Sequence, residues 1–556
     1  DFKHSNFQTF QDIHEMMVKA IQRRNKLEET ISHKELPTNV DAEEFKEPEW
    51  ATSEQELENR LLRLKALQLK AIASAEEETQ DQFIKRIQKR RLNHENEMLG
   101  ESPEEKQKWI LSTVLKAMAS GLDNHTNYFT PSEASQFMIQ VQQRLFGIGA
   151  QLKDNLNGFS IVRILEGGPV AQSNKLKIND RIIAVNHTPV IGLDITEAVE
   201  MIRGEKGTPV HLTIHRDLEG SKQVEKFDIE LTRGEVVLEE SRLESSLDPF
   251  ADGAILHLKL FSFYQDPNSS STQDIAKAIE NAKKEHPLKA IILDLRSNAG
   301  GLLPQAVSVT GLFITKGVVV SIKDDSGKVQ SLRAMDDKMV WDGPLFVLTN
   351  RASASAAEIV AQTLQDYGRA VIIGDDHTFG KGTFQTFTLD SENNGKVNPQ
   401  GEVKVTRGKY YTVSGFSPQL KGVKADIVVP GILSELDIGE EFSKYPLEND
   451  SISPHFEDDL SDIPLLHRET LGRLYKKNLQ PILTTYKPFM EILKKNSDAR
   501  IKNNKNYQLF LEEIRNKKFT NPSVELFEQS DQQYQATLNI VKDFLYLQQM
   551  AEKPFE

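Results

Sequence analysis

Residues 345–358 read LFVLTNRASASAAE, and this stretch decides how the fold is interpreted. Its first five residues form an apolar run typical of a buried strand, and Ala356–Gln365 continues with a helical pattern. The next apolar run, Ala370–Ile373, predicts a further strand. Upstream, the same alternation of strand, helix and strand is predicted for Ala254–Leu260, Thr272–Lys284 and Lys289–Leu295. Such alternation predicts an α/β core with a mainly parallel sheet, which we assign to residues 235–437.

Short β-rich runs separated by Gly, Asn and Asp occupy residues 144–234, upstream of this core. Runs of this kind are typical of a small β-rich domain. One helix is predicted inside it, at Ile195–Ile202. The predicted strands are Phe159–Leu165, Arg181–Val185, Val210–His215 and Phe227–Leu231.

Both ends of the chain are predicted to be helical. Residues 1–102 carry amphipathic stretches, and residues 103–143 form a helical lead-in to the core. Residues 438–556 are highly charged and carry no strand signals. The expected fold is multidomain α+β, with an α/β core, an inserted β-rich domain and helical N- and C-terminal regions. The clearest predicted helices are Glu54–Leu69, Lys106–Ser120, Leu465–Leu479 and Tyr534–Gln549, and a loop is predicted at Gly121–Pro131.

Composition excludes several classes of function. The net charge of −14 argues against nucleic acid or anionic lipid as the main partner. With no cysteine, the chain has no disulfide, no thiolate chemistry and no Cys-based zinc site. No apolar run approaches eighteen residues, so no transmembrane helix is expected. The chain begins Asp1-Phe2-Lys3 without Met, so we expect a processed chain whose targeting segment is missing.

Ser355 follows the strand at 345–349 and precedes the helix that starts at Ala356. A serine at such a turn lies near free backbone N–H groups and the positive end of a helix dipole. That location favours a nucleophile whose product is an oxyanion. The alternative is purely structural, since Ser355 and Glu358 also have the spacing of a capping box.

Lys381 lies between two glycines in the stretch TFGKGTFQ, residues 378–385. The neighbouring Phe379 and Phe384 can desolvate its ammonium, and burial lowers a lysine pKa, so a neutral amine could accept a serine proton. The alternative is a turn lysine on the surface. A phosphate loop is excluded, because five residues separate Gly374 from Gly380 and a glycine replaces the required Ser/Thr.

The stretch DLRSNAGG, residues 294–301, ends another buried strand. Its Gly300-Gly301 turn offers N–H groups for an oxyanion hole, or is simply a strand-to-helix turn. A Ser-His-Asp arrangement is the alternative, with His125, His257 and His377 near plausible strand ends, but nothing local distinguishes any of them. No metal site is predicted, because His14-Glu15 lacks the second His of a zinc-protease helix.

Taken in order, the three stretches resemble those of the C-terminal processing peptidases, also called tail-specific proteases. Phe146-Gly147-Ile148-Gly149 resembles the opening of the family's PDZ module, and further matches lie at 123–128, 167–171 and 179–182. The resemblance covers about residues 103–435. The helical ends resemble the larger periplasmic type of Gram-negative bacteria, and their length and charge look closest to the chlamydial members.

The resemblance implies roles for these residues. Ser355 would be the nucleophile, Lys381 the general base and Gln385 the residue that orients the lysine. Gly300 or Gly301, together with Ala356, would supply the oxyanion hole through backbone N–H groups. The PDZ module would span 144–234 and bind peptide tails at Phe146, Gly147, Ile148 and Gly149.

The resemblance also implies a serine endopeptidase that needs no cofactor. We expect its partners to be protein substrates with apolar C-termini, because the negative charge disfavours acidic tails, and a homodimer is kept open. The expected location is the periplasm, or beyond it after secretion. The competing class is a binding protein, either a PDZ module on a catalytically silent core or a chaperone-like adaptor.

Overall fold

The structure is a computed structural model that describes residues 7–31, 33–45, 49–70, 77–100, 102–142, 144–155, 158–165, 167–191, 193–217, 224–237, 242–387, 397–516 and 531–552. The chain forms two compact units. One contains residues 1–117 and 144–237, and the other contains residues 118–143 and 238–556. Each unit is described by itself.

The larger unit is built on a six-stranded sheet in the order β10-β11-β12-β15-β16-β19. The edge strand β10 (Leu243–Phe250) is antiparallel to β11 (Gly253–Leu260), and all further neighbours are parallel. Strands β12 (Leu288–Asp294), β15 (Leu345–Thr349), β16 (Val371–Gly374) and β19 (Ile427–Val428) complete it. Every residue of β15 is buried, which explains its unbroken apolar run. The predicted α/β core with a mainly parallel sheet is confirmed.

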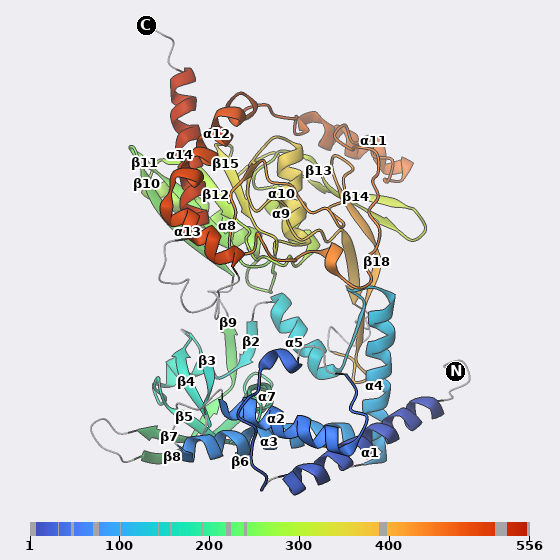
Figure 1. The fold of residues 1–556 in the computed structure, drawn as a ribbon. Helices are drawn as coiled ribbons and strands as arrows, with labels where there is room; N and C mark the ends of the chain where they lie inside the picture. The colour runs from blue at the N-terminus through green and yellow to red at the C-terminus, as the bar shows by residue number, and fades with distance from the viewer. Residues whose placement is uncertain are drawn as a thin grey trace. The chain divides into compact units, whose positions relative to one another are not determined.

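Helices cover both faces of this sheet (Figure 1). On one face, α8 (Ser271–Glu285), α9 (Leu303–Thr310) and α10 (Ala356–Asp366) pack on the odd-numbered side chains of β15, such as Val347. On the other face, α12 (Met490–Asn503), α13 (Lys505–Arg515) and α14 (Gln532–Glu552) pack on the even-numbered ones, such as Phe346.

The C-terminal helices therefore complete the core of the larger unit instead of enclosing a core of their own. Phe544 in α14 is fully buried against the sheet, and each such side chain contributes about 1.5–3 kcal/mol. The boundary predicted at residue 438 lies inside this unit. Helix was also expected directly after Ile438, but α11 (Leu465–Tyr475) is the first α-helix there. Residues 443–464 instead run in turns and extended segments, in which Asp458 and Asp462 bind Arg333.

A second, five-stranded sheet belongs to the same unit and was not predicted. Its order is β1 (Asn127–Phe129), β18 (Glu402–Thr412), β13 (Gly317–Asp324) and β14 (Val329–Ala334), and β17 (Thr383–Phe387) also pairs with β18. The predicted loop 121–131 thus contains a strand, and α5 (Pro131–Gln142) follows it. Strand β17 begins two residues after Lys381, so this sheet positions the lysine segment.

The smaller unit contains a β-rich domain in the expected place. Its main sheet has the order β3 (Ala150–Asn155), β4 (Gly158–Ile164), β5 (Arg181–Val185), β7 (Pro209–Asp217) and β8 (Val224–Thr232), and β6 (Thr188–Pro189) pairs with β5. Strands β2 (Arg144–Gly147) and β9 (Gly234–Val237) pair separately. Helices α6 (Pro169–Ser173) and α7 (Ile195–Ile202) close its core, which contains Phe159, Ile182 and Leu212.

The N-terminal helices are α1 (Gln8–Ile31), α2 (Glu54–Lys70), α3 (Glu77–Leu99) and α4 (Pro103–Leu122). Within the smaller unit, Ile31, Leu61 and Leu62 form a small core between α1 and α2. Glu95 of α3 accepts hydrogen bonds from Arg24 and Asn25 of α1. The predicted helices Glu54–Leu69 and Lys106–Ser120 agree with α2 and α4 within three residues at each end.

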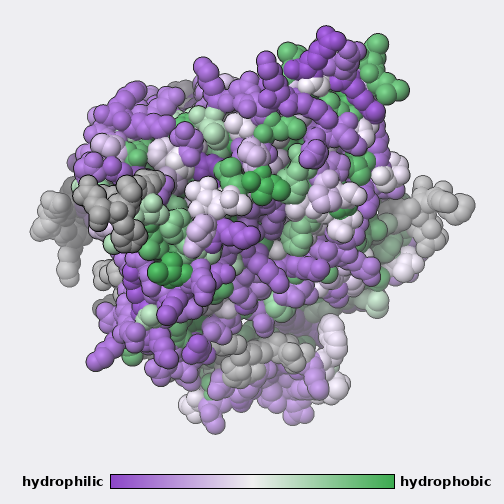
Figure 2. Space-filling view, turned by 90° about the horizontal axis from the view of Figure 1, so that it is seen from above, coloured by the Kyte–Doolittle hydropathy of each residue, from purple (hydrophilic) through white to green (hydrophobic). Residues whose placement is uncertain are grey.

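Hydrophilic residues predominate on the molecular face drawn in Figure 2, and hydrophobic residues appear there in small separate groups. Among the described helices, none combines the length and apolar character that a membrane span requires.

Candidate active site

Ser355 lies at the turn from β15 into α10, where its backbone adopts φ 56° and ψ −114°. This positive-φ conformation is rare for a residue with a side chain and stores about 1–3 kcal/mol of strain. The residue is partly exposed and begins α10 with the capping box that the structural alternative expected, in which Glu358 accepts from the Ser355 N–H, while the Ser355 hydroxyl makes no side-chain cap hydrogen bond. The turn therefore holds an available hydroxyl in a strained backbone.

The Glu358 carboxylate joins the serine turn to the lysine segment. One oxygen accepts from the backbone N–H groups of Ser355 (2.8 Å) and Lys381 (2.9 Å). The other accepts from the Gly380 N–H (2.7 Å) and the Thr378 hydroxyl (2.6 Å). Burial raises the pKa of Glu358 to about 7, although these four hydrogen bonds lower it.

Tyr410 of β18 connects the same two segments from another side. Its buried hydroxyl contacts the carbonyl oxygen of Lys381 and lies 3.1 Å from that of Ser355. Because Glu358 binds the N–H groups and Tyr410 binds the carbonyls, both backbones are fixed relative to each other. The structure thus brings Ser355 and Lys381 into one site.

Lys381 has the environment of a lysine that loses its proton easily. Burial, and then the nearby charge of Lys404, lower the pKa of Lys381 to about 8, whereas the acidic groups of Glu440, Glu358 and Asp123 act in the opposite direction. Among the described residues, its amine has neither an ion pair nor a hydrogen-bond partner. The surface-lysine alternative does not fit these surroundings.

The two glycines predicted for the oxyanion hole lie in different environments. The Gly300 N–H donates to the Asn298 side chain (2.8 Å), so it is already used. In the described part of the chain, the N–H groups of Gly301 and Ala356 have no acceptor. Gly300 is still required, because a Cβ there would lie 2.8 Å from the Cβ of Ser355.

Gln385 lies on β17 but does not reach the lysine in this structure. Its amide donates to the hydroxyls of Thr383 (2.9 Å) and Thr406 (3.3 Å). No hydrogen bond joins the side chains of Ser355, Lys381 and Gln385, all of which are described residues. Glu358 and Tyr410 bring Ser355 and Lys381 together, whereas the Gln385 amide binds Thr383 and Thr406 instead.

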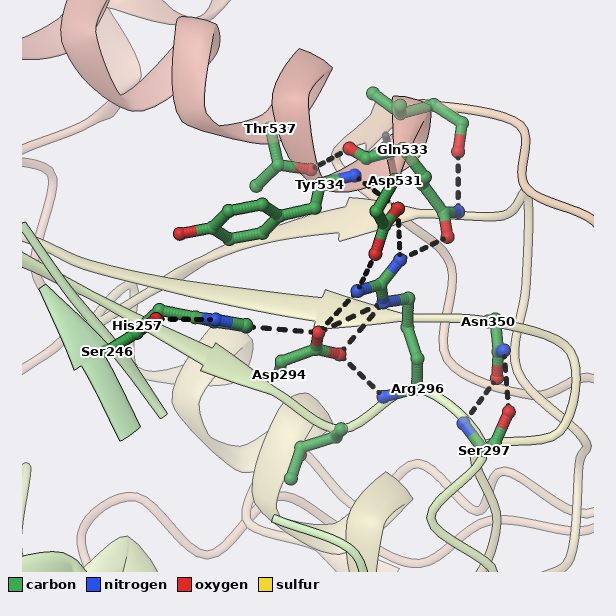
Figure 3. Close-up of polar contacts among 12 residues, drawn as sticks. Ser246, His257, Asp294, Arg296, Ser297, Asn350, Asp531, Gln533, Tyr534 and Thr537 are labelled. Carbon is green, nitrogen blue, oxygen red and sulfur yellow. Dashed lines mark hydrogen bonds and ion pairs between the residues drawn. The ribbon is translucent and has the colours of Figure 1, made fainter. Parts of the chain in front are cut away.

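The three candidate histidines contact groups other than Ser355. His257 lies 3.2 Å from Asp294 and 3.5 Å from Ser246, which has the order of a Ser-His-Asp chain (Figure 3). The longer distance is at the limit of a hydrogen bond, and Asp294 is shared with Arg296. His125 contacts Glu440 (2.7 Å), and His377 contacts the Thr378 carbonyl (2.8 Å).

The stretch predicted to bind tails forms the end of β2 and the turn after it. Gly149 has φ +76°, and a Cβ there would lie 2.9 Å from the Cα of Gly168. Ile148 is only 3% exposed and packs in the core of its domain, so it does not line an open pocket as expected. In the described chain, the N–H groups of Ile148 and Gly149 have no acceptor, while their carbonyls accept from Val170 and Leu165. Gly147 is buried beside Phe146 in β2.

Sequence reasoning missed Tyr410, because nothing in the charged stretch of β18 marks one tyrosine as different. The sequence identifies Glu358 only as a capping partner of Ser355. The fixed spacing between the two residues is the sequence feature that could have indicated its role in the site. No group of three or more potential metal ligands occurs among the described residues.

Comparisons with known proteins match three parts of the chain. The profile of peptidase family S41 matches residues 253–429, the tail specific protease N-terminal domain matches residues 1–132, and the PDZ domain matches residues 136–215. The carboxy-terminal-processing protease of Bartonella bacilliformis is 33% identical over 59% of this chain and 71% of its own length. The tail-specific protease of Haemophilus influenzae is 36% identical over 62% of this chain, which spans 49% of that relative. A solved photosystem II D1 C-terminal processing protease is 25% identical, covering 61% of this chain and 86% of that chain with a TM-score of 0.34.

The strain at Ser355 generates a prediction about stability. Ser355→Gly should be more stable than Ser355→Ala by about 0.5–2 kcal/mol, because glycine tolerates the positive φ and loses only part of the gain as chain entropy. Urea unfolding of both variants measures the difference. Equal stability, or a more stable alanine variant, would show that the turn is not strained.

Proposed function

The chain belongs to peptidase family S41, and from that premise we propose that it is a serine endopeptidase with Ser355 as nucleophile and Lys381 as general base. We further propose that its PDZ domain selects substrates by their apolar C-terminal tails. No metal or cofactor is needed for this chemistry.

One observation carries the proposal. Lys381 is a partly buried amine without a partner among the described residues, and Glu358 and Tyr410 tie its backbone to that of a strained, available serine. A structural lysine would be expected to pair with a carboxylate, whereas a base must keep its lone pair free. With a pKa of about 8, a useful fraction of Lys381 is neutral near pH 7–8.

The reaction follows from these roles. Neutral Lys381 takes the Ser355 hydroxyl proton as the serine oxygen bonds to the peptide carbonyl carbon, whose oxygen becomes an oxyanion. The lysine ammonium then protonates the leaving nitrogen, and the C–N bond breaks. Water attacks the acyl-enzyme with its proton passing to Lys381, and the serine leaves with a proton returned from the lysine.

The free N–H groups of Gly301 and Ala356 support their assignment as the oxyanion donors. Gly300 contributes by allowing the close approach to Ser355 instead of donating. Gln385 would turn toward Lys381 to orient it, exchanging its hydrogen bonds to Thr383 and Thr406.

Tail recognition is supported by the PDZ domain itself. Strand β3 lies at the edge of its sheet, beside α7, so an extended peptide can add to it as a further strand. The free N–H groups of Ile148 and Gly149 suit a terminal carboxylate. Partly exposed Leu152 on β3 and Ile195 on α7 offer apolar contacts for the last side chain. A periplasmic location and a homodimer are supported only by the family resemblance.

Removing either reactive group should abolish hydrolysis while the protein stays folded. We expect Ser355→Ala and Lys381→Ala to lose at least about a thousandfold in rate, and Lys381→Arg to fail as well, because a guanidinium keeps its proton. Gln385→Ala should lose less. Cleavage of an unfolded protein substrate is measured on gels, with circular dichroism as the check on folding.

Lys421→Ala is the matched control, since Lys421 is an exposed lysine in a loop of the same unit, and it should retain full activity. Substantial hydrolysis by Lys381→Arg would refute the lysine base. A wild-type protein that binds tails without cutting would favour the silent PDZ module instead.

Substrate choice should depend on the free end of the substrate. A model protein ending in Ala or Leu should be cut at internal sites several-fold faster than the same protein amidated or ending in Asp-Asp, because both changes oppose carboxylate capture in an apolar site. Initial rates on the three substrates measure this preference. Equal rates on all three would refute tail recognition and leave the serine and lysine chemistry untouched.

A further inference from the structure

We propose that the first turn of α14, through Asp531 and Gln533, positions the three loops that carry the proposed catalytic groups. The inference rests on the proposed function and adds positioning residues from the C-terminal helix to it. The three loops are residues 294–301, 350–355 and 375–381, and each follows a parallel strand of the central sheet.

Arg296 connects α14 to the loop that ends at Gly301 (Figure 3). Its guanidinium binds the fully buried Asp294 (2.6 Å) and forms a two-pronged ion pair with Asp531 (2.7 and 2.9 Å). Burial opposes ionisation of Asp294, yet the charge of Arg296 and the hydrogen bond from His257 hold the pKa of Asp294 well below its usual range. The Arg296 guanidinium is therefore held between two carboxylates, those of Asp294 and Asp531.

Gln533 connects α14 to the other two loops. Its side chain is only 5% exposed, accepts from Arg296 (3.3 Å), and donates to Asp375 (3.1 Å) and to the Val429 carbonyl (2.8 Å). Asp375 in turn accepts from the backbone N–H of Arg351 (3.1 Å) in the serine loop. Gln533 thus contacts the loop 294–301 directly, through Arg296. Through the carboxylate of Asp375, which begins the loop 375–381, it also reaches the loop 350–355.

Direct bonds between the loops transmit this positioning to the reacting groups. The Ser297 N–H donates to Asn350 (2.8 Å), the Ala354 N–H donates to the Asn298 carbonyl (2.9 Å), and the Phe379 N–H donates to the Ser353 carbonyl (2.9 Å). A displacement of Arg296 or Asp375 would therefore shift the Ser355 turn and the Lys381 segment as well.

Apolar packing fixes where this polar turn lies. Farther along α14, Val541, Phe544 and Leu545 are buried on the face of the sheet opposite α10. Asp531 also caps the helix, accepting from the Tyr534 N–H (3.0 Å). A helix anchored by its core residues presents Asp531 and Gln533 at the ends of the strands where the loops begin.

The test compares Gln533→Ala and Asp531→Asn with Asp543→Asn. The last variant removes an ion pair of the same helix to Arg500 on α12, away from the loops. Asparagine still caps a helix, so Asp531→Asn removes the charge alone. We expect both loop variants to lower kcat at least about tenfold with KM within twofold, since misplacement of reacting groups by about 1 Å costs up to a hundredfold. Asp543→Asn should change neither, and Asp531→Glu should restore most of kcat.

Backbone hydrogen exchange of the same variants in the Ser355→Ala background separates this inference from the proposed function, because it needs no activity. Exchange should rise in residues 296–302, 351–356 and 376–382 and stay unchanged in α8. Unchanged exchange in the three loops, or kcat losses no larger than in Asp543→Asn, would overturn the inference. A wild-type protein without hydrolysis would refute only the proposed function.

Discussion

The buried carboxylate of Glu358 is the interaction on which the rest of the site depends. An ionised carboxylate inside a protein costs several kcal/mol unless every lone pair has a donor. Here four donors meet it, and they come from the serine turn and from the lysine segment. Neither segment can move away without leaving the buried Glu358 carboxyl group short of hydrogen bonds, so these bonds fix the two segments relative to each other.

The parallel sheet explains why these segments are close enough to share one carboxylate. Strands β12, β15 and β16 are adjacent and parallel, so their carboxyl ends lie at one edge. The loops that follow them carry Gly301, Ser355 and Lys381. Packing on both faces holds this edge rigid, and the C-terminal helices supply one of those two layers.

Much of this could be predicted from local sequence. The apolar runs of β12, β15 and β16 are long enough to identify buried parallel strands, and the serine and lysine segments follow two of them. Strand β18 could not be predicted, because its charged and polar residues pair with β13, β1 and β17 from distant parts of the sequence. For the same reason, the amphipathic pattern of α14 identified a helix without indicating that its apolar face covers the sheet. The distinction between Gly300 and Gly301 depends on the Asn298 side chain, which sequence spacing does not reveal.

The pH dependence of Ser355 phosphonylation, in which the serine oxygen displaces fluoride from a phosphonate, tests the central claim most directly. A reactive fluorophosphonate is applied between about pH 6 and 10, and peptide mass spectrometry locates the adduct. The account predicts one adduct, on Ser355, with a rate that rises through about pH 8 as Lys381 loses its proton, and this rise should persist when His125, His257 or His377 is replaced by alanine. A rise that survives Lys381→Arg, or disappears with one of the histidines, would contradict it.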